Sequence, residues 1–185
     1  GDAQCVVAGG MESMSNAPHY VYGMRGGIKA GDQPLVDGMI RDGLWDSFSN
    51  THMGNLAEYT AKKAGVSRKD QDEFALASHK KAVAAIEACH FKAEILPVEK
   101  VEKDEGPRAD TSLEKLAALK PSFEKDGSVT PGNAPGLNDG ASALVVTSLA
   151  YAKAHGLKPL ARVPAYATGG GDPQDLFFAP IDAVK

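Results

Sequence analysis

The sequence predicts an α/β fold, and three features of the chain predict it. Residues 5–8 are an apolar run with two adjacent valines, as in a buried strand. The segment after Ser67 has the composition and periodicity of a long amphipathic helix. Residues 141–147, 149–155 and 160–168 then indicate a strand, a short helix and another strand-like run. Strands and helices that alternate along the chain are typical of the α/β class.

The first half of the chain is expected to place two helices after a long irregular segment. Residues 9–43 are rich in Gly, Met and Pro without a sustained period, so we expect an irregular segment packed on other structure. Residues 54–64 predict a helix that ends at Gly65. In the second helix Ser67 precedes Asp70 by three residues, an imperfect capping box, and an apolar stripe is expected to include Phe74, Ser78, Ala82, Ala85, Ile86 and Cys89.

The second half is expected to contain shorter elements. Residues 95–98 predict an edge strand, because Pro97 cannot donate to a ladder, and the charged residues 99–108 predict a solvated loop or hairpin. Ser112 is expected to cap a helix that runs through residue 119, before Pro121. Residues 125–127 predict a turn, and a change of composition near Gly132 suggests a domain boundary.

Composition excludes several classes of function. The chain has 185 residues, 43% of them hydrophobic, which is enough for a buried core. Its formal net charge of −4 argues against binding to nucleic acid, which requires a concentration of Lys and Arg. No apolar stretch approaches the roughly 20 residues that span a bilayer, so no membrane span is expected. Two cysteines and no targeting segment suggest a cytoplasmic protein, and both ends look like cuts through a larger fold.

No metal site or activated nucleophile is predicted. Cys5 and Cys89 are expected to be small buried apolar residues, since each lies in an apolar pattern. The five histidines lack metal-ligand spacing. Residues 169–172 favour a tight exit from a strand over an anion-binding loop, because the spacing of a phosphate-binding motif is missing.

Two segments leave packing and ligand binding as open alternatives. Residues 130–140 contain three Gly, two Pro and two Asn, which specify a rigid backbone path. That path is either an elaborate turn or a loop that another molecule approaches closely. His52, Met53 and Gly54 are either simple packing ahead of a helix or the lining of a partly apolar pocket.

Four motifs, in this order, resemble those of thiolases. They are Val7-Ala8-Gly9-Gly10-Met11-Glu12-Ser13-Met14-Ser15, Thr51-His52-Met53-Gly54-Asn55-Leu56-Ala57-Glu58, Ser67-Arg68-Lys69-Asp70-Gln71-Asp72 and Gly132-Asn133-Ala134-Pro135-Gly136-Leu137-Asn138-Asp139-Gly140-Ala141. The resemblance covers essentially the whole chain and is closest to the short-chain acetyl-CoA acetyltransferases. It implies a thiolase fold in which residues 1–14 end the N-terminal core domain, residues 15–137 form the coenzyme A-binding loop domain, and residues 138–185 begin the C-terminal core domain.

The resemblance also implies the residues that bind substrate. Leu44 and His52 match positions near the pantetheine arm of coenzyme A, and Met53 matches the methionine that closes the acyl pocket. Arg108 matches a basic position beside the nucleotide, where a cation offsets phosphate charge. Phe123 matches an apolar wall, and Leu176 matches a position that lines the acyl pocket. The loop on which pantetheine lies is matched by Ala134, Pro135, Gly136 and Leu137. Pro135 departs from relatives that have serine there, and Phe177 and Phe178 depart from relatives with smaller residues.

The family's catalytic cysteines, its Gly-His-Pro histidine and its Asn-Glu-Ala-Phe motif have no match among these residues. The chain alone is therefore expected to be inactive. The implied parent enzyme condenses two acetyl-CoA to acetoacetyl-CoA and CoA, or runs the reverse thiolysis, with the thioester as substrate and no further cofactor. The alternatives are a longer-chain 3-ketoacyl-CoA thiolase of fatty-acid degradation and a non-catalytic CoA-binding or oligomerisation module. The resemblance also implies a homodimer or homotetramer, and the loops around His52 and Asn133 are expected to form one wall of a pantetheine groove.

Overall fold

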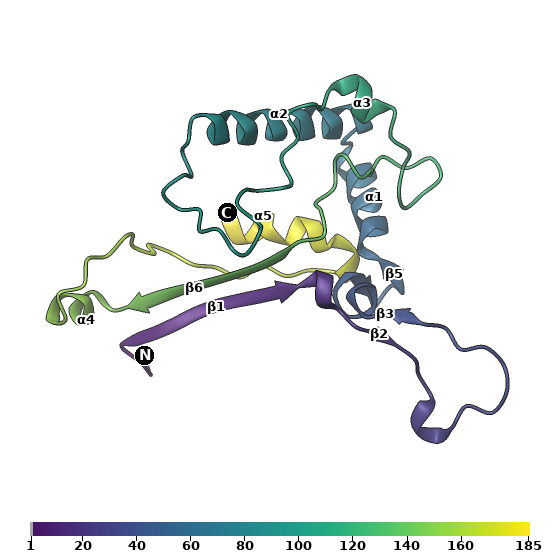
Figure 1. Ribbon diagram of the computed structural model, residues 1–185, viewed down its shortest axis with the longest axis horizontal. Helices are drawn as coiled ribbons and strands as arrows, with labels where there is room; N and C mark the ends of the chain where they lie inside the picture. Colours follow the sequence, from purple (N-terminus) through teal and green to yellow (C-terminus); the bar gives the residue numbers. More distant parts are fainter. Residues whose placement is uncertain (1) are drawn as a thin grey trace. The chain divides into compact units, whose positions relative to one another are not determined.

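A computed structural model describes residues 2–185 (Figure 1). The chain forms two compact units. The first, called the sheet unit, comprises the residues up to 44 together with residues 137–170 and 179–185. The second, called the helical unit, comprises residues 45–136 and 171–178. The three-part division at residues 14 and 137 concerns a complete thiolase fold and stays a prediction.

The sheet unit is built on a two-stranded antiparallel ribbon. Strands β1 (Cys5–Ser13) and β6 (Asp139–Thr147) pair along their full lengths, with Cys5 opposite Thr147 and Ser13 opposite Asp139 (Figure 1). Both strands were predicted, although β1 extends five residues beyond the run at 5–8. Large side chains are exposed on the ribbon, among them Val7, Met11 and Val145. Continuous apolar runs of this kind are typical of strands that are buried on both faces.

Polar contacts fix the register of the ribbon at both of its ends. The Ser148 amide donates to the Gln4 carbonyl at 3.0 Å. At the other end the Ser15 amide donates to Asp139 Oδ1 at 3.0 Å, and the Ser15 hydroxyl donates to Asp139 Oδ2. The hydroxyl, and then the amide, hold the pKa of Asp139 below its ordinary value. The carboxylate therefore joins the end of β1 to the start of β6.

The rest of the sheet unit consists of short elements. Residues 9–43, expected to be irregular, contain the end of β1 and a small hairpin. The elements are 3-10 helix η1 (Met14–Asn16), β2 (His19–Tyr20) paired with β3 (Val36–Asp37), 3-10 helix η2 (Met24–Gly26), π-helix η3 (Ile40–Leu44), α4 (Leu149–Ala154) and α5 (Ala179–Val184). Helix α4 confirms the prediction for residues 149–155.

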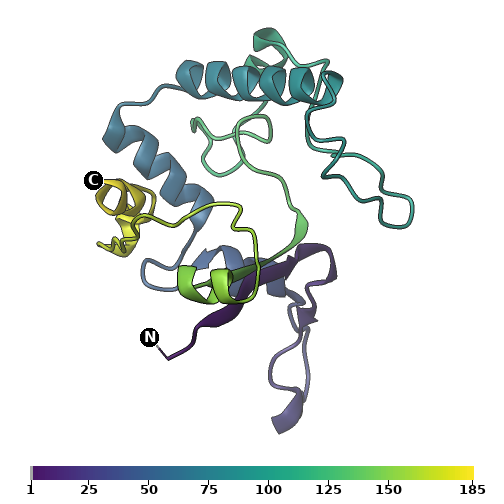
Figure 2. The ribbon, with the colours of Figure 1, turned by 90° about the vertical axis from the view of Figure 1, so that its left-hand side faces the viewer.

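The helical unit begins with a hairpin and two long helices. Strands β4 (Trp45–Asp46) and β5 (Thr51–His52) pair, and α1 (Met53–Ala64) follows directly. As predicted, α1 ends at Gly65, which is left-handed with φ 67°. Helix α2 (Arg68–Glu87) runs in a different direction (Figure 2), and both bonds of its capping box are present. Helix α3 (Leu113–Ala117) and 3-10 helix η4 (Pro173–Phe178) complete the unit.

The core of the helical unit combines apolar and polar side chains. Leu56, Leu116 and Val129 are buried, and so are Glu58, Asp72 and Thr130. A buried carboxylate is costly unless hydrogen bonds replace its water. Each of these polar side chains therefore has specific hydrogen-bond partners, such as Val129 for Glu58 and Asn133 for Asp72.

Two predicted strands are absent from the described residues. Residues 95–98 form no strand, and only an isolated bridge joins Val98 to Val101. Residues 160–168 have no ladder partner, and Leu160 is 98% exposed. Both runs have strand-like composition, but a strand also requires a neighbour with which to pair. The expected strand, helix and strand unit therefore consists here of β6 and α4, and residues 169–171 do not follow a strand.

The predicted burial of α2 and of the cysteines is wrong for this chain. Phe74, placed on the apolar stripe, is 79% exposed, whereas Asp72 is buried. The partners of α2 are α3 and the loop near residue 128, and they select a different face from the one that the apolar pattern marked. Cys89 lies just beyond the helix with φ 57°, and both Cys5 and Cys89 are exposed.

Candidate functional site

His52 and Met53 lie at the point where β5 passes into α1. His52 is the N-cap residue of α1, and its Nδ1 accepts a hydrogen bond from the Gly54 amide at 2.9 Å. A neutral imidazole whose Nδ1 accepts has its proton on Nε2. His52 and Met53 are both half-buried. The cap therefore fixes the ring and leaves Nε2 as its donor atom.

Phe123 packs against this junction from a distant part of the chain. Its ring stacks on His52 with centroids 4.9 Å apart and an interplanar angle of 23°. A Cβ at Gly54 would lie 2.3 Å from atoms of the Phe123 ring, so a side chain at Gly54 would displace the ring. The Asn55 amide group also donates to the Phe123 carbonyl at 3.4 Å. The structure thus brings His52 and Phe123 into contact, with Met53 next to His52 in the chain, and the role of the three residues in binding substrate stays a prediction.

Glu58 attaches the next loop to α1. Its carboxylate accepts the amides of Ser128 and Val129 and the Ser128 hydroxyl, at 2.8 to 2.9 Å, and the residue is only 1% exposed. Burial raises the pKa of Glu58 and is the largest single effect, but the hydrogen bonds from Ser128 and Val129, with help from Lys62, leave the pKa below its ordinary value. The ionised carboxylate therefore holds residues 128 and 129 on the helix.

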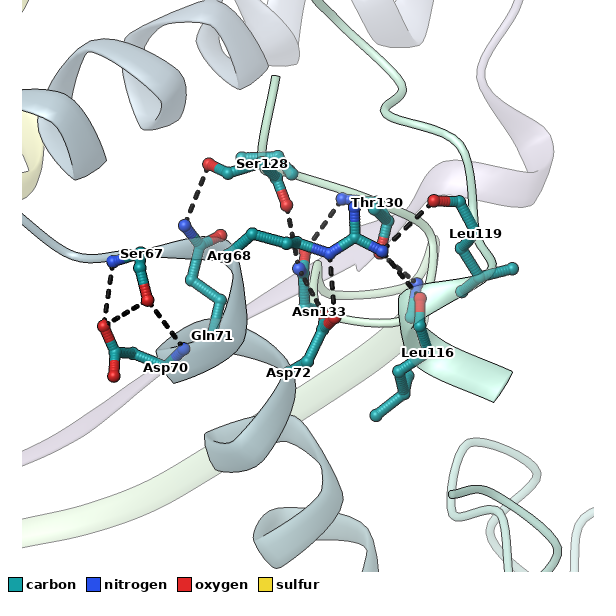
Figure 3. A network of polar contacts seen from close by, with 12 residues as sticks. Ser67, Arg68, Asp70, Gln71, Asp72, Leu116, Leu119, Ser128, Thr130 and Asn133 are labelled. Atoms are coloured by element: carbon teal, nitrogen blue, oxygen red, sulfur yellow. Dashed lines mark hydrogen bonds and ion pairs between the residues drawn. The ribbon is translucent and has the colours of Figure 1, made fainter. Parts of the chain in front are cut away.

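A second buried carboxylate, Asp72, attaches the loop to α2 (Figure 3). Asp72 Oδ2 accepts from Arg68 Nε at 2.8 Å, and Asp72 Oδ1 accepts from Asn133 Nδ2 at 3.0 Å. The same guanidinium donates to the carbonyls of Leu116 and Leu119, at 2.6 and 3.1 Å. Gln71 Nε2 donates to the Ser128 hydroxyl at 2.9 Å. The start of α2 thus connects α3 with the loop that contains Ser128 and Asn133.

The loop that was predicted to carry pantetheine continues directly from this network. The Ala134 amide donates to the Thr130 carbonyl at 3.1 Å, and Ala134 is half-buried. Pro135 and Gly136 are exposed, and Pro135 has no amide hydrogen to donate. The loops around His52 and Asn133, which were expected to form one wall of a pantetheine groove, both belong to the helical unit. Whether they form a groove stays a prediction.

Arg108 and Leu176 lie on other parts of the helical unit. The Arg108 amide donates to His79 Nδ1 at 3.2 Å, and its side chain is exposed. Leu176 is 45% exposed on η4, next to Asp175, whose carboxylate accepts two bonds from Lys63 of α1 at 2.6 and 2.7 Å. Lys63 therefore fixes η4, and with it Leu176, against α1.

Leu44 and Leu137 belong to the sheet unit, whereas the other eight predicted binding residues belong to the helical unit. Leu44 is half-buried and Leu137 is 66% exposed. Among residues 2–185 no cluster of His, Cys, Asp and Glu could hold a metal ion. No helix in that part of the chain is both long and apolar enough to cross a bilayer.

The sequence did not single out Glu58, Arg68 or Asp72. Acidic and basic residues on a helix are ordinarily solvated. Arg68 and Asp72 stand four residues apart and pair on α2, but that spacing does not distinguish a buried pair from an exposed one. Their other partners, and those of Glu58, lie far along the chain, at residues 116 to 133. A capping box at Ser67 was visible, but it reports only where α2 begins.

Comparisons with known proteins identify the family of this chain. The family model described as "Thiolase, N-terminal domain" matches residues 1–150. An acetyl-CoA acetyltransferase of Pseudomonas aeruginosa is 50% identical over 194 residues, which cover 100% of this chain and 49% of that protein. A probable acetyl-CoA acetyltransferase of Escherichia coli is 47% identical, with the same coverage of both chains.

A solved structure shows the same fold. A crystal structure of human mitochondrial 3-ketoacyl-CoA thiolase in complex with CoA matches with a TM-score of 0.92 and 39% identity, covering 99% of this chain and 47% of that one. The chain thus spans about half the length of the relatives that it matches. The family match over residues 1–150, the identity to relatives along the whole chain and the fold together establish that this chain belongs to the thiolase family.

Proposed function

We propose that this chain is the coenzyme A-binding section of an acetyl-CoA acetyltransferase. The complete enzyme condenses two acetyl-CoA to acetoacetyl-CoA and CoA, or cleaves acetoacetyl-CoA with CoA in the reverse direction. Two relatives, about half of whose length this chain covers, are described as an acetyl-CoA acetyltransferase and a probable acetyl-CoA acetyltransferase. A similar solved structure contains CoA. The observation that supports the proposal most is the contact between His52 and Phe123 in the unit that also holds the loop at residues 133–136.

In this proposal the pantetheine arm lies along Ala134, Pro135 and Gly136, with His52 and Phe123 beside it. Pantetheine has amide groups that require hydrogen-bond partners when they leave water. Pro135 supplies only a carbonyl, whereas His52 has Nε2 as a donor because its Nδ1 is occupied by the Gly54 amide. His52 therefore takes over part of the hydrogen bonding that a serine at residue 135 provides in relatives.

Arg108 contacts the phosphates at the nucleotide end of CoA in this proposal. A guanidinium remains charged at every physiological pH and pairs with two phosphate oxygens at once. The Arg108 side chain is exposed, and its positive charge is among the influences that lower the pKa of Asp110, after the hydrogen bond and charge of Lys115. Its charge is thus available to a ligand.

Met53 and Leu176 limit the acyl pocket in this proposal. Met53 is half-buried beside His52, and Leu176 is exposed on η4, which Lys63 fixes to α1. Side chains that fill the pocket exclude long acyl groups sterically, so acetyl and acetoacetyl groups are preferred.

Thiolysis of acetoacetyl-CoA tests the proposed function. We expect the complete enzyme to cleave acetoacetyl-CoA with CoA, and this chain alone to show no turnover, because the family's catalytic cysteines and histidine have no match in it. A complete enzyme without thiolysis activity, or turnover by the chain alone at the same rate, would refute the proposal.

A longer-chain 3-ketoacyl-CoA thiolase of fatty-acid degradation is the second candidate, favoured by the similarity to the human mitochondrial structure. Met53→Ala in the complete enzyme separates the two. If Met53 closes a short pocket, the variant gains activity on 3-ketohexanoyl-CoA relative to acetoacetyl-CoA by at least several-fold. An unchanged chain-length profile would remove Met53 from the pocket.

The third candidate is a non-catalytic CoA-binding or oligomerisation module. In the proposed enzyme the chain belongs to a cytoplasmic homodimer or homotetramer that serves fatty-acid metabolism. Titrating the isolated chain with CoA, together with sedimentation to measure its mass in solution, separates binding from assembly.

A further inference from the structure

Asp72 is a buried carboxylate whose two oxygens have different partners. Its side chain is 5% exposed, with Oδ2 facing Arg68 and Oδ1 facing Asn133 (Figure 3). Arg68, four residues earlier on α2, is itself bonded to two carbonyls at the end of α3. The carboxylate is therefore anchored on one side, and its other oxygen meets a single side-chain donor.

That donor, Asn133, closes the loop from which the proposed pantetheine-binding residues extend. Asn133 Nδ2 also donates to the Ser128 carbonyl at 3.0 Å, and Asn133 Oδ1 accepts the Thr130 amide at 2.8 Å. The amides of Asn133 and Ala134 both donate to the Thr130 carbonyl, at 3.2 and 3.1 Å. Thr130 is fully buried. The side chain of Asn133 thus uses both its donor group and its acceptor oxygen.

The orientation of the Asn133 amide depends on Asp72 being a carboxylate. A carboxylate only accepts, so the NH₂ group of Asn133 must face Asp72 and its oxygen must face the Thr130 amide. With asparagine at residue 72, the oxygen of the new amide satisfies Arg68, and its NH₂ group then opposes the NH₂ group of Asn133. Relieving that conflict either turns Asn133 over, which breaks its bonds to Thr130 and Ser128, or turns the new amide over, which sets its NH₂ group against the Arg68 donor.

We propose that Asp72 is a positioning residue for coenzyme A binding, which acts through Asn133 to hold residues 134–136 in their binding conformation. Asp72 does not touch the ligand. The proposal rests on the proposed function, because it concerns the segment on which pantetheine lies there. It predicts a loop that is already ordered without CoA, so that CoA binding costs less conformational entropy.

The test compares Asp72→Asn with Ser67→Ala in the complete enzyme. Ser67→Ala removes the cap of the same helix and lowers stability, but it leaves the contact between Asp72 and Asn133 intact. We expect Asp72→Asn to raise the KM for CoA in thiolysis about tenfold, with kcat within about twofold, and Ser67→Ala to change neither. The double variant Asp72→Asn with Asn133→Asp re-forms one bond between the two residues and should recover part of the KM.

The outcomes distinguish a failure of the proposed function from a failure of the proposed role of Asp72. If the unmodified enzyme does not catalyse thiolysis, the proposed function fails. If it does and both single variants have the KM of the unmodified enzyme, or raise it equally, the positioning role of Asp72 is overturned while the function stands.

If Asp72→Asn does not fold, hydrogen exchange on the unmodified enzyme tests whether the loop is ordered without CoA. The amides of Thr130, Gly132 and Ala134 should exchange slowly without CoA, because each donates within the loop. Fast exchange that becomes slow only when CoA is added would contradict a preformed loop and overturn the proposal.

Discussion

Glu58 is the residue whose removal should most weaken the helical unit. In Glu58→Gln one oxygen becomes an NH₂ group that faces the Ser128 amide and either the Val129 amide or the Ser128 hydroxyl, so the single remaining oxygen cannot accept from every donor that the carboxylate serves. We expect a loss of about 2 kcal/mol in the free energy of unfolding. Urea titration followed by the fluorescence of Trp45, the single tryptophan and a member of this unit, measures it.

Glu73→Gln is the matched control for that measurement. Glu73 lies on α2, where its half-exposed side chain pairs with Lys69 at 3.4 Å. An exposed ion pair contributes little, so the control should change stability by less than about 0.5 kcal/mol. Equal losses in the two variants would show that the buried hydrogen bonds of Glu58 are not what holds residues 128 and 129.

Glu58 should also make the stability of the helical unit depend on pH. Its pKa in the folded chain lies below the ordinary value of 4.5. The contribution of a carboxylate with a lowered pKa is complete above the unfolded pKa and is lost as the pH falls through the folded pKa. The difference in stability between the unmodified chain and Glu58→Gln should therefore be largest near neutral pH and shrink below about pH 4.5. A difference that is constant from pH 7 to pH 3 would contradict this.

Gly54 makes the contact between α1 and Phe123 possible. In Gly54→Ala the new Cβ lies 2.3 Å from the Phe123 ring. The ring must therefore move away from residue 54, which disturbs its stacking on His52. Overpacking of this kind costs about 1 to 3 kcal/mol, which exceeds the gain of at most ~1 kcal/mol from the higher helix propensity of alanine. A net loss in urea titration is expected, whereas Gly106→Ala, with no atoms within 4 Å of its new Cβ, should lose nothing.

A fall in stability that is the same for both glycine variants would mean that Phe123 does not press on Gly54. The residue types at His52 and Met53 left packing and a pocket lining as alternatives, whereas Phe123 was marked only through a family resemblance. The stacking of Phe123 on His52 joins residues 71 positions apart, and no local pattern specifies such a pair.

At the scale of elements, the cap of α2 is the feature that the sequence predicted most completely. Ser67 and Asp70 stand at the spacing of a capping box, and both of its hydrogen bonds are present. Helix ends are set by neighbouring residues, which is why this prediction, like that for α1 and Gly65, is confirmed. The strands at residues 95–98 and 160–168 failed for the opposite reason, since a ladder requires a partner from elsewhere in the chain.

Ser67→Ala should therefore destabilise α2 without disturbing its contacts to the loop. Loss of an N-cap hydroxyl costs about 1 kcal/mol. Circular dichroism during urea unfolding measures the change, and Ser78→Ala, on the same helix but away from its start, should stay within about 0.5 kcal/mol of the unmodified chain. A loss as large in Ser78→Ala would show that the effect is not due to the cap.

At the scale of the whole molecule, the two units differ in how well the sequence foretold them. The antiparallel ribbon of β1 and β6 joins residues more than 120 positions apart, and each strand was visible as an apolar run although their pairing was not. In the helical unit the burial of Glu58 and Asp72 could not be predicted, because the sequence does not distinguish a buried carboxylate from a solvated one. These two carboxylates hold the loop at residues 128–136, on which pantetheine is proposed to lie.

We propose that CoA binds to the helical unit of this chain, and a crystal structure of the complete enzyme with CoA would show where the ligand lies. The claim predicts the pantetheine arm within about 4 Å of Ala134, Pro135 and Gly136, with His52 and Met53 beside it. It also predicts the phosphates near Arg108. Coenzyme A bound to a surface that includes none of these residues would contradict the claim.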